Sequence, residues 1–176
     1  MAPDPFDLIA PSDSFMVDLT LASSTDFSWQ AAGSSLPNDT MTYLLEINSD
    51  PTFTAPPLVS GTSVELTTQT LTVTGLPRGT WVYWHVTATN RLDSSTVSTT
   101  DRTMGVYSRG DLDQNGAADV ADLTMLIDHL FISFATPDND FFVPAGNLNC
   151  QGTVDVADLT ALIDMLFISF NIPACP

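Results

Sequence analysis

The chain contains no lysine, and its positive side chains are four arginines among 176 residues. Acidic residues number 21, and all but two of them are aspartates, so the net charge is −17. Nucleic acids and anionic lipid surfaces are themselves polyanions and attract basic proteins. We therefore expect neither nucleic-acid binding nor membrane insertion. An aspartate surplus is typical of a solvated surface or of ligands for hard cations, and the spacing of the carboxylates distinguishes these two cases.

Long apolar runs are also missing. No 18-residue apolar stretch occurs, and the first residues, MAPDPFDLIAPSD, lack the basic segment followed by an apolar segment that defines a signal peptide. We therefore predict no membrane-spanning helix and no signal peptide at this start. If the protein is secreted, we expect Met1 to be a processed start.

Catalytic motifs are missing as well. The sequence has no G-x-S-x-G, no H-E-x-x-H and no phosphate-binding glycine loop. Its two histidines, His85 and His129, have no neighbouring cysteine or second histidine. The clustered aspartates are all explained below as metal ligands or helix-surface residues. We therefore predict that this chain is not an enzyme.

Only two cysteines occur, Cys150 and Cys175. Without a nearby histidine they cannot complete a tetrahedral zinc site. A disulfide between them would close a loop of 26 residues and, on the chain-entropy model, stabilise the fold by about 3 to 4 kcal/mol. Free thiols and an intermolecular bond are the alternatives.

The first half of the chain alternates apolar and polar residues in short runs, which is the pattern of strands with one buried face. Turn-forming stretches such as SSLPND, NSDP and GLPRG separate the runs. This arrangement favours an antiparallel β-sandwich of about 100 residues. The alternating residues are Phe27 and Trp29; Tyr43, Leu45 and Ile47; Leu71 and Val73; and Val82, Trp84, Val86 and Ala88.

The segment LTVTGLPRGTWVYWHVTATN resembles the E to F region of a fibronectin type III domain. The resemblance covers residues 5–107 and implies an adhesion-type β-sandwich with Trp29 as the core tryptophan of its second strand. It also implies that Leu76, Trp84, Val86 and Ala88 point inward. We place this domain at residues 1–108.

The second half contains an internal repeat. Residues 119–134 read DVADLTMLIDHLFISF and residues 155–170 read DVADLTALIDMLFISF. The copies differ only at Met125 against Ala161 and at His129 against Met165. Such identity indicates one structural unit used twice, and its apolar spacing predicts an amphipathic helix in each copy.

A twelve-residue stretch, residues 111–122 (loop 1), leads into the first repeated helix. It has oxygen-bearing side chains at positions 1, 3, 5, 9 and 12 and a glycine, Gly116, at position 6. Calcium takes six to eight oxygens and needs alternate ligands in a tightly curled loop, with a carboxylate from the entering helix. The alternative is an aspartate-rich turn that only caps the helix. The predicted ligands are Asp111, Asp113, Asn115, the carbonyl of Ala117, Asp119 and Asp122.

Residues 147–158 (loop 2) precede the second copy and keep the glycine, Gly152. Amides stand at positions 1, 3 and 5, and those at positions 1 and 3 replace acids, so four carboxylates become two and we expect weaker calcium binding. The corresponding ligands are Asn147, Asn149, Gln151, the carbonyl of Thr153, Asp155 and Asp158.

Residues 110–123 match, position by position, the pattern G-D-x-(D/N)-x-(D/N)-G-x-x-x-x-x-D-L of a type I dockerin, and residues 146–159 match it with the amide changes noted. The resemblance implies a small α module at residues 109–176, with paired EF-hand-like calcium loops and Ca²⁺ as the bound ion. The predicted fold class is therefore two domains, a fibronectin type III-like sandwich followed by this module. An ordinary EF-hand-like calcium buffer is the alternative.

Dockerins bind cohesin modules through their duplicated helices, so the resemblance implies a partner-binding face on each repeat. At loop positions 10 and 11, where cellulosomal members commonly have a pair of hydroxyl residues, this chain has small apolar residues, Val120 with Ala121 and Val156 with Ala157. Asp128 and Asp164 lie where a basic residue is often seen. This departure indicates a partner other than the familiar cellulosomal one. The predicted face comprises Val120, Ala121, Ile127, Asp128 and Phe131, with Val156, Ala157, Ile163, Asp164 and Phe167.

Together these features predict an extracellular or cell-surface, non-catalytic docking or scaffolding module that binds a cohesin-like or other extracellular protein in a calcium-dependent way. One alternative is a structural subunit that polymerises into a filament or tube. Another is the C-terminal fragment of a secreted polysaccharide-degrading enzyme whose catalytic domain lies outside this chain.

Overall fold

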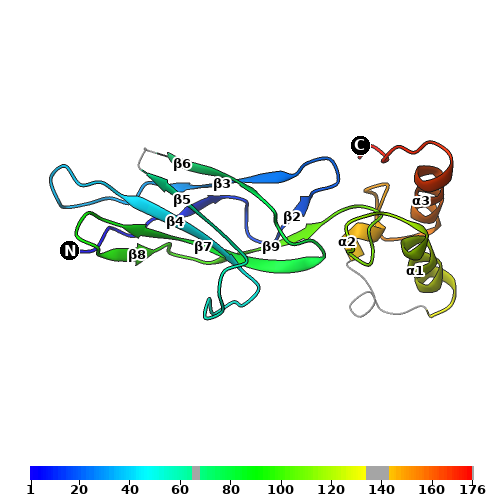
Figure 1. The fold of residues 1–176 in the computed structure, drawn as a ribbon, viewed down its shortest axis with the longest axis horizontal. Coiled ribbons are helices and arrows are strands. Elements are labelled where there is room, and N and C mark those ends of the chain that lie inside the picture. Colours follow the sequence, from blue (N-terminus) through cyan, green and yellow to red (C-terminus); the bar gives the residue numbers. More distant parts are fainter. Residues whose placement is uncertain (65–67, 134–142, 176) are drawn as a thin grey trace. The chain divides into compact units, whose positions relative to one another are not determined.

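The computed structural model describes residues 1–64, 68–133 and 143–175 (Figure 1). Within these ranges, nine strands precede three helices. The strands are β1 Leu8–Ala10, β2 Phe15–Asp18, β3 Ser24–Gln30, β4 Thr42–Asn48, β5 Val59–Val64, β6 Thr68–Thr74, β7 Thr80–Thr89, β8 Ser95–Val97 and β9 Arg102–Tyr107. The helices are α1 Val120–Phe131, α2 Val143–Gly146 and α3 Val156–Phe167.

The strands form two sheets. The first has the order β1-β3-β6, and the second has the order β2-β9-β7-β4-β5, with β8 also pairing with β7. Strand β4 pairs antiparallel with both of its neighbours, so that Leu45 lies opposite Gly61 on β5 and opposite Val86 on β7. In the first sheet Phe27 lies opposite Leu71.

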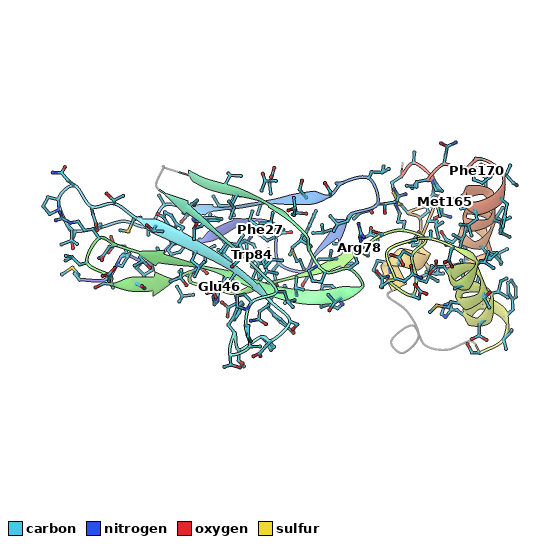
Figure 2. The ribbon with its side chains drawn as sticks, in the orientation of Figure 1. Phe27, Glu46, Arg78, Trp84, Met165 and Phe170 are labelled. Atoms are coloured by element: carbon cyan, nitrogen blue, oxygen red, sulfur yellow. A yellow bond between two sulfur atoms is a disulfide. The ribbon has the colours of Figure 1, made fainter. Side chains whose placement is uncertain are left out.

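Alternation along the strands buries one side of each sheet, as the sequence indicates. Phe27 of β3 and Trp84 of β7 belong to different sheets, and their rings meet edge to face at 5.0 Å between centroids (Figure 2). Trp29 of β3 and Tyr43 of β4 meet at 5.9 Å. The core of the β-rich part is therefore aromatic and lies between the two sheets.

Helices α1 and α3 begin in the same way. Asp119 and Asp155 are the N-cap residues, and each accepts a hydrogen bond from the backbone N–H two residues on. Asp122 and Asp158 complete capping boxes by accepting from the N-cap backbone. These boxes satisfy backbone donors that a helix start otherwise leaves unpaired. Within the described ranges, no helix has the length and apolar character needed to cross a membrane.

A second core lies around the helices. Leu126 of α1 and Leu162 of α3 are fully buried and pack together with Leu112, Leu148 and Met165. Gly110 adjoins this core with φ +83°, and a Cβ there would lie 2.7 Å from the Met165 side chain. Glycine is favoured here because any other residue would be strained at this φ, and a Cβ would also displace the end of the Met165 side chain.

Residue contacts divide the chain into two compact units. Unit 1 comprises residues 1–17, 23–77 and 81–105, and unit 2 comprises residues 18–22, 78–80 and 106–176. The loops and helices of the repeat therefore cluster with two short segments from the β-rich half.

The predicted fold class, a fibronectin type III-like sandwich followed by a separate small α dockerin module, is wrong. The described residues are mainly β-sheet with three short helices, and the helical unit incorporates segments 18–22 and 78–80. Hydrophobic periodicity could not show this, because it reports which face of an element is buried and not which distant segments join the same core.

Candidate metal centre

Three carboxylates converge in loop 1. One oxygen each from Asp111, Asp113 and Asp122 lies within 4.8 Å of the others. Asp111 is 2% exposed and Asp122 is fully buried, whereas Asp113 is exposed. Buried carboxylates so close together repel one another unless a proton or a cation compensates their charge.

Asp122 joins the two ends of loop 1. Its Oδ1 accepts hydrogen bonds from the backbone N–H groups of Leu112 at 2.6 Å and Asp113 at 3.0 Å. Its Oδ2 accepts from the backbone N–H of Asp119 at 2.7 Å. One side chain thus holds positions 2 and 3 of the loop and the N-cap of α1.

Asp111 has an unsatisfied oxygen. Its Oδ2 accepts from the backbone N–H of Gly116 at 3.1 Å, but its Oδ1 is buried and has no hydrogen-bond partner. Burial raises the pKa of Asp111, and the charges of Asp122 and Asp113 raise it further, against the lowering effect of the Gly116 N–H. A buried carboxylate oxygen without a donor is unfavourable, and a cation bound to it would remove that cost.

The backbone of loop 1 curls around this cluster. Gln114 has φ +61° and Gly116 has φ +103°, and Asp113 and Asn115 each accept a hydrogen bond from the N–H two residues on. Every predicted ligand in this loop is an oxygen. Such a donor set fits a hard divalent cation rather than a soft metal, which prefers sulfur or imidazole.

Loop 2 repeats the fold of loop 1 with other side chains. Asp158 is fully buried and accepts from the N–H groups of Asn149 at 3.0 Å and Asp155 at 2.9 Å. Cys150 and Gly152 have positive φ, as do their counterparts Gln114 and Gly116. Loop 2 therefore repeats the backbone turns and the buried helix-cap carboxylate of loop 1, but only two of its predicted ligands are carboxylates, against four in loop 1.

The cysteines are brought together as well. Cys150 and Cys175 form a disulfide, with their Cα atoms 5.4 Å apart. The Arg109 side chain lies beside this bond and donates from Nη1 to the carbonyl oxygens of Leu148 at 3.3 Å and Pro173 at 2.6 Å. Sequence reasoning missed Arg109, because no local pattern signals a residue whose partners are 39 and 64 positions away.

The predicted partner-binding residues lie on α1 and α3 with matching exposure. Phe131 and Phe167 are 51% and 53% exposed, and Ile132 and Ile168 beyond them are each 69% exposed. Asp128 and Asp164 are half-buried. The remaining members of the predicted face are all exposed: Val120, Ala121 and Ile127, and Val156, Ala157 and Ile163. Phe134, the last residue of the first repeat, lies outside the described residues.

His85 belongs to a separate polar cluster in unit 1. Its Nε2 lies 3.3 Å from Glu46 Oε2 and its Nδ1 lies 3.2 Å from Asp101 Oδ1. Its ring stacks on Phe53 with centroids 3.7 Å apart. Both ring nitrogens therefore face carboxylates and one ring face is covered, which is a structural environment for an imidazole.

No protein-family model matches this chain, and no curated protein matches it in sequence. Among solved structures, the chain is similar to a superoxide reductase (neelaredoxin) from Ignicoccus hospitalis, with a TM-score of 0.39 and 12% identity over 60% of this chain and 82% of that one. No activity is transferred from a match at this level.

Proposed function

We propose that this chain is a non-catalytic, calcium-dependent docking module that binds an extracellular protein partner of the cohesin-like kind. The observation that carries the proposal is the buried Oδ1 of Asp111, which has no donor and lies in a cluster with Asp113 and Asp122. Calcium is the ion we propose, because the loop offers only oxygen ligands in a twelve-residue frame with glycine at position 6.

Calcium would act on docking through Asp122. This residue is both a member of the carboxylate cluster and the capping-box residue of α1. Without a cation the repulsion within the cluster favours opening of the loop, and opening removes the capping hydrogen bonds that fix where α1 begins. Binding of calcium to the folded loop therefore stabilises the helix that carries the proposed docking face.

Exposed apolar residues supply the proposed docking surface. Phe131, Ile132 and their counterparts Phe167 and Ile168 are at least half exposed. Large exposed apolar groups that recur on two helices are typical of a protein-binding face. The net charge of −17 favours a partner whose surface is basic around an apolar centre. The match of residues 110–123 to the dockerin loop pattern also supports this proposal.

Calcium titration of matched variants tests the proposal. Asp113→Ala removes an exposed ligand of loop 1 without changing the buried cap and should lower calcium affinity at least about tenfold. Asp128→Asn, on α1 and outside the loop, should leave calcium affinity unchanged. Circular dichroism would establish that both variants are folded. Equal calcium affinity in Asp113→Ala and the unmodified protein would contradict the proposal.

The same exposed helix faces would also serve a self-assembling structural subunit. Light scattering at matched protein concentration, in millimolar calcium and then in excess chelator, separates the two functions. A compact monomer in calcium supports the docking module. Large polymers that form in calcium and dissolve in chelator would favour the subunit.

A further inference from the structure

The two loops differ most at position 1. In loop 1 this position is Asp111, whose Oδ1 has no partner. In loop 2 it is Asn147, whose Nδ2 donates to the carbonyl oxygen of Gly152 at 3.2 Å and whose Oδ1 accepts from the backbone N–H of Gln151 at 3.1 Å. The Asn147 amide thus bridges position 1 to positions 5 and 6, and both of its polar atoms are used.

The loops also differ at position 4. Gln114 in loop 1 bonds within its own loop, through Nε2 to the carbonyl oxygen of Asp111. Its counterpart Cys150 is covalently joined to Cys175. Loop 2 is therefore fastened to the C-terminal segment by a bond that needs no ion.

A third difference is the charge around each loop. Loop 2 has two carboxylates where loop 1 has four. The guanidinium of Arg109 also lies against loop 2, with Nη1 3.3 Å from the Leu148 carbonyl oxygen and 3.6 Å from Cys150 Sγ. Fewer carboxylates disfavour a second cation here, and the Arg109 guanidinium, which is paired with Asp18, adds no negative charge to attract one.

We infer that loop 2 is closed without a metal ion, by the Asn147 amide and the Cys150–Cys175 disulfide, and that the protein binds one divalent cation per chain, in loop 1. Asn147 is then the residue that makes the duplicated loops differ in metal binding. This inference rests on the proposed calcium site of loop 1.

Calorimetric titration of the full chain with calcium chloride tests the number of sites. We expect one calcium per chain. Two ions per chain would overturn the inference while leaving the proposed function intact, and no binding would overturn both. The three results are therefore distinguishable in a single titration.

Matched substitutions at position 1 then identify the loop that holds the ion. Asp111→Asn should abolish the single binding event, and Asn147→Ala should leave both stoichiometry and affinity within about twofold of the unmodified protein. A loss of about tenfold or more in Asn147→Ala, or binding that persists unchanged in Asp111→Asn, would contradict the inference.

Amide hydrogen exchange gives an independent readout of loop closure. Chelator should speed exchange at Gly116 in loop 1 and leave Gln151 in loop 2 unchanged while the disulfide is intact. Reduction of the disulfide should then speed exchange at Gln151. Equal acceleration of both loops by chelator alone would overturn the inference.

Discussion

Arg109 donates from Nε to Oδ2 of Asp18 at 2.8 Å, and its side chain is only 3% exposed. Because Arg109 also donates to two carbonyl oxygens, its removal leaves several acceptors unpaired. We expect Arg109→Met to lower the free energy of unfolding by about 3 kcal/mol, the usual cost of breaking one side of a buried pair. Urea denaturation followed by circular dichroism measures this change.

Arg91 provides the control for this substitution. Its Nε is 4.0 Å from Asp39 Oδ1 and its side chain is about half exposed. Asp39 keeps its hydrogen bonds from the Ser34 hydroxyl and the Thr40 N–H when the guanidinium is removed, so Arg91→Met should cost less than about 1 kcal/mol. A cost for Arg109→Met as small as that expected for Arg91→Met would show that Arg109 does not stabilise unit 2.

The turn after β4 should depend on pH through Asp50. Hydrogen bonds from the side chains of Thr54 and Thr52, and from their backbone N–H groups, hold the pKa of Asp50 well below its usual range. A lowered pKa in the folded state means that the folded turn binds fewer protons than the unfolded chain. Its stabilising contribution is therefore complete above the ordinary aspartate pKa and is lost as pH falls through the lowered one.

An NMR titration of the Asp50 carboxyl carbon and the Thr52 amide proton would test this. Both signals should stay unchanged from neutral pH to well below the ordinary aspartate range. The carboxyl of Asp93, which is exposed in another turn, serves as the reference signal in the same titration. Titration of Asp50 at or above the ordinary value would refute the prediction.

Leu126 should be among the most sensitive positions of the helical core. It lies on α1 and is fully buried in the core that includes Leu162 of α3. Leu126→Ala therefore leaves a cavity and should lower the free energy of unfolding by about 2 to 5 kcal/mol. Ile132→Ala, at an exposed position just after α1, should cost less than about 0.5 kcal/mol. Thermal or urea denaturation of the pair measures both values, and a small cost at Leu126 would show that the core is not packed as described.

The disulfide should contribute to stability independently of calcium. Cys175→Ser should lower the free energy of unfolding by about 3 kcal/mol on the chain-entropy model. A reductant should destabilise the unmodified protein by a similar amount and have no further effect on the variant. An additional effect of reductant on Cys175→Ser would indicate that it acts elsewhere.

Sequence periodicity located half of the twelve described elements. The alternation around Trp29, Leu45 and Trp84 falls on β3, β4 and β7, and these side chains are fully buried. The repeated segments form α1 and α3, each beginning after the aspartate at loop position 9. Such features are local, since they depend on the spacing of neighbouring residues and on helix capping.

Long-range features could not be predicted in this way. Segments 18–22 and 78–80 join the helical unit although they are far from it in sequence, and Arg109 connects Asp18 to Leu148 and Pro173. For the candidate site, the residue types indicated an oxygen-lined loop. Only the structure shows that Asp111 Oδ1 lacks a hydrogen-bond partner, whereas both polar atoms of the Asn147 amide have one. That difference depends on side-chain orientation, which residue type does not reveal.

The duplicated helices have diverged on one side only. They differ at two positions, with Met125 against Ala161 and His129 against Met165, and all four residues are at least half-buried. Three of them, Met125, Ala161 and Met165, pack in the core around Leu126 and Leu162. Every exposed position of α1 has the same residue in α3. The two copies therefore present the same residues to solvent twice, whereas the interior that they share receives a different side chain from each copy at these two positions.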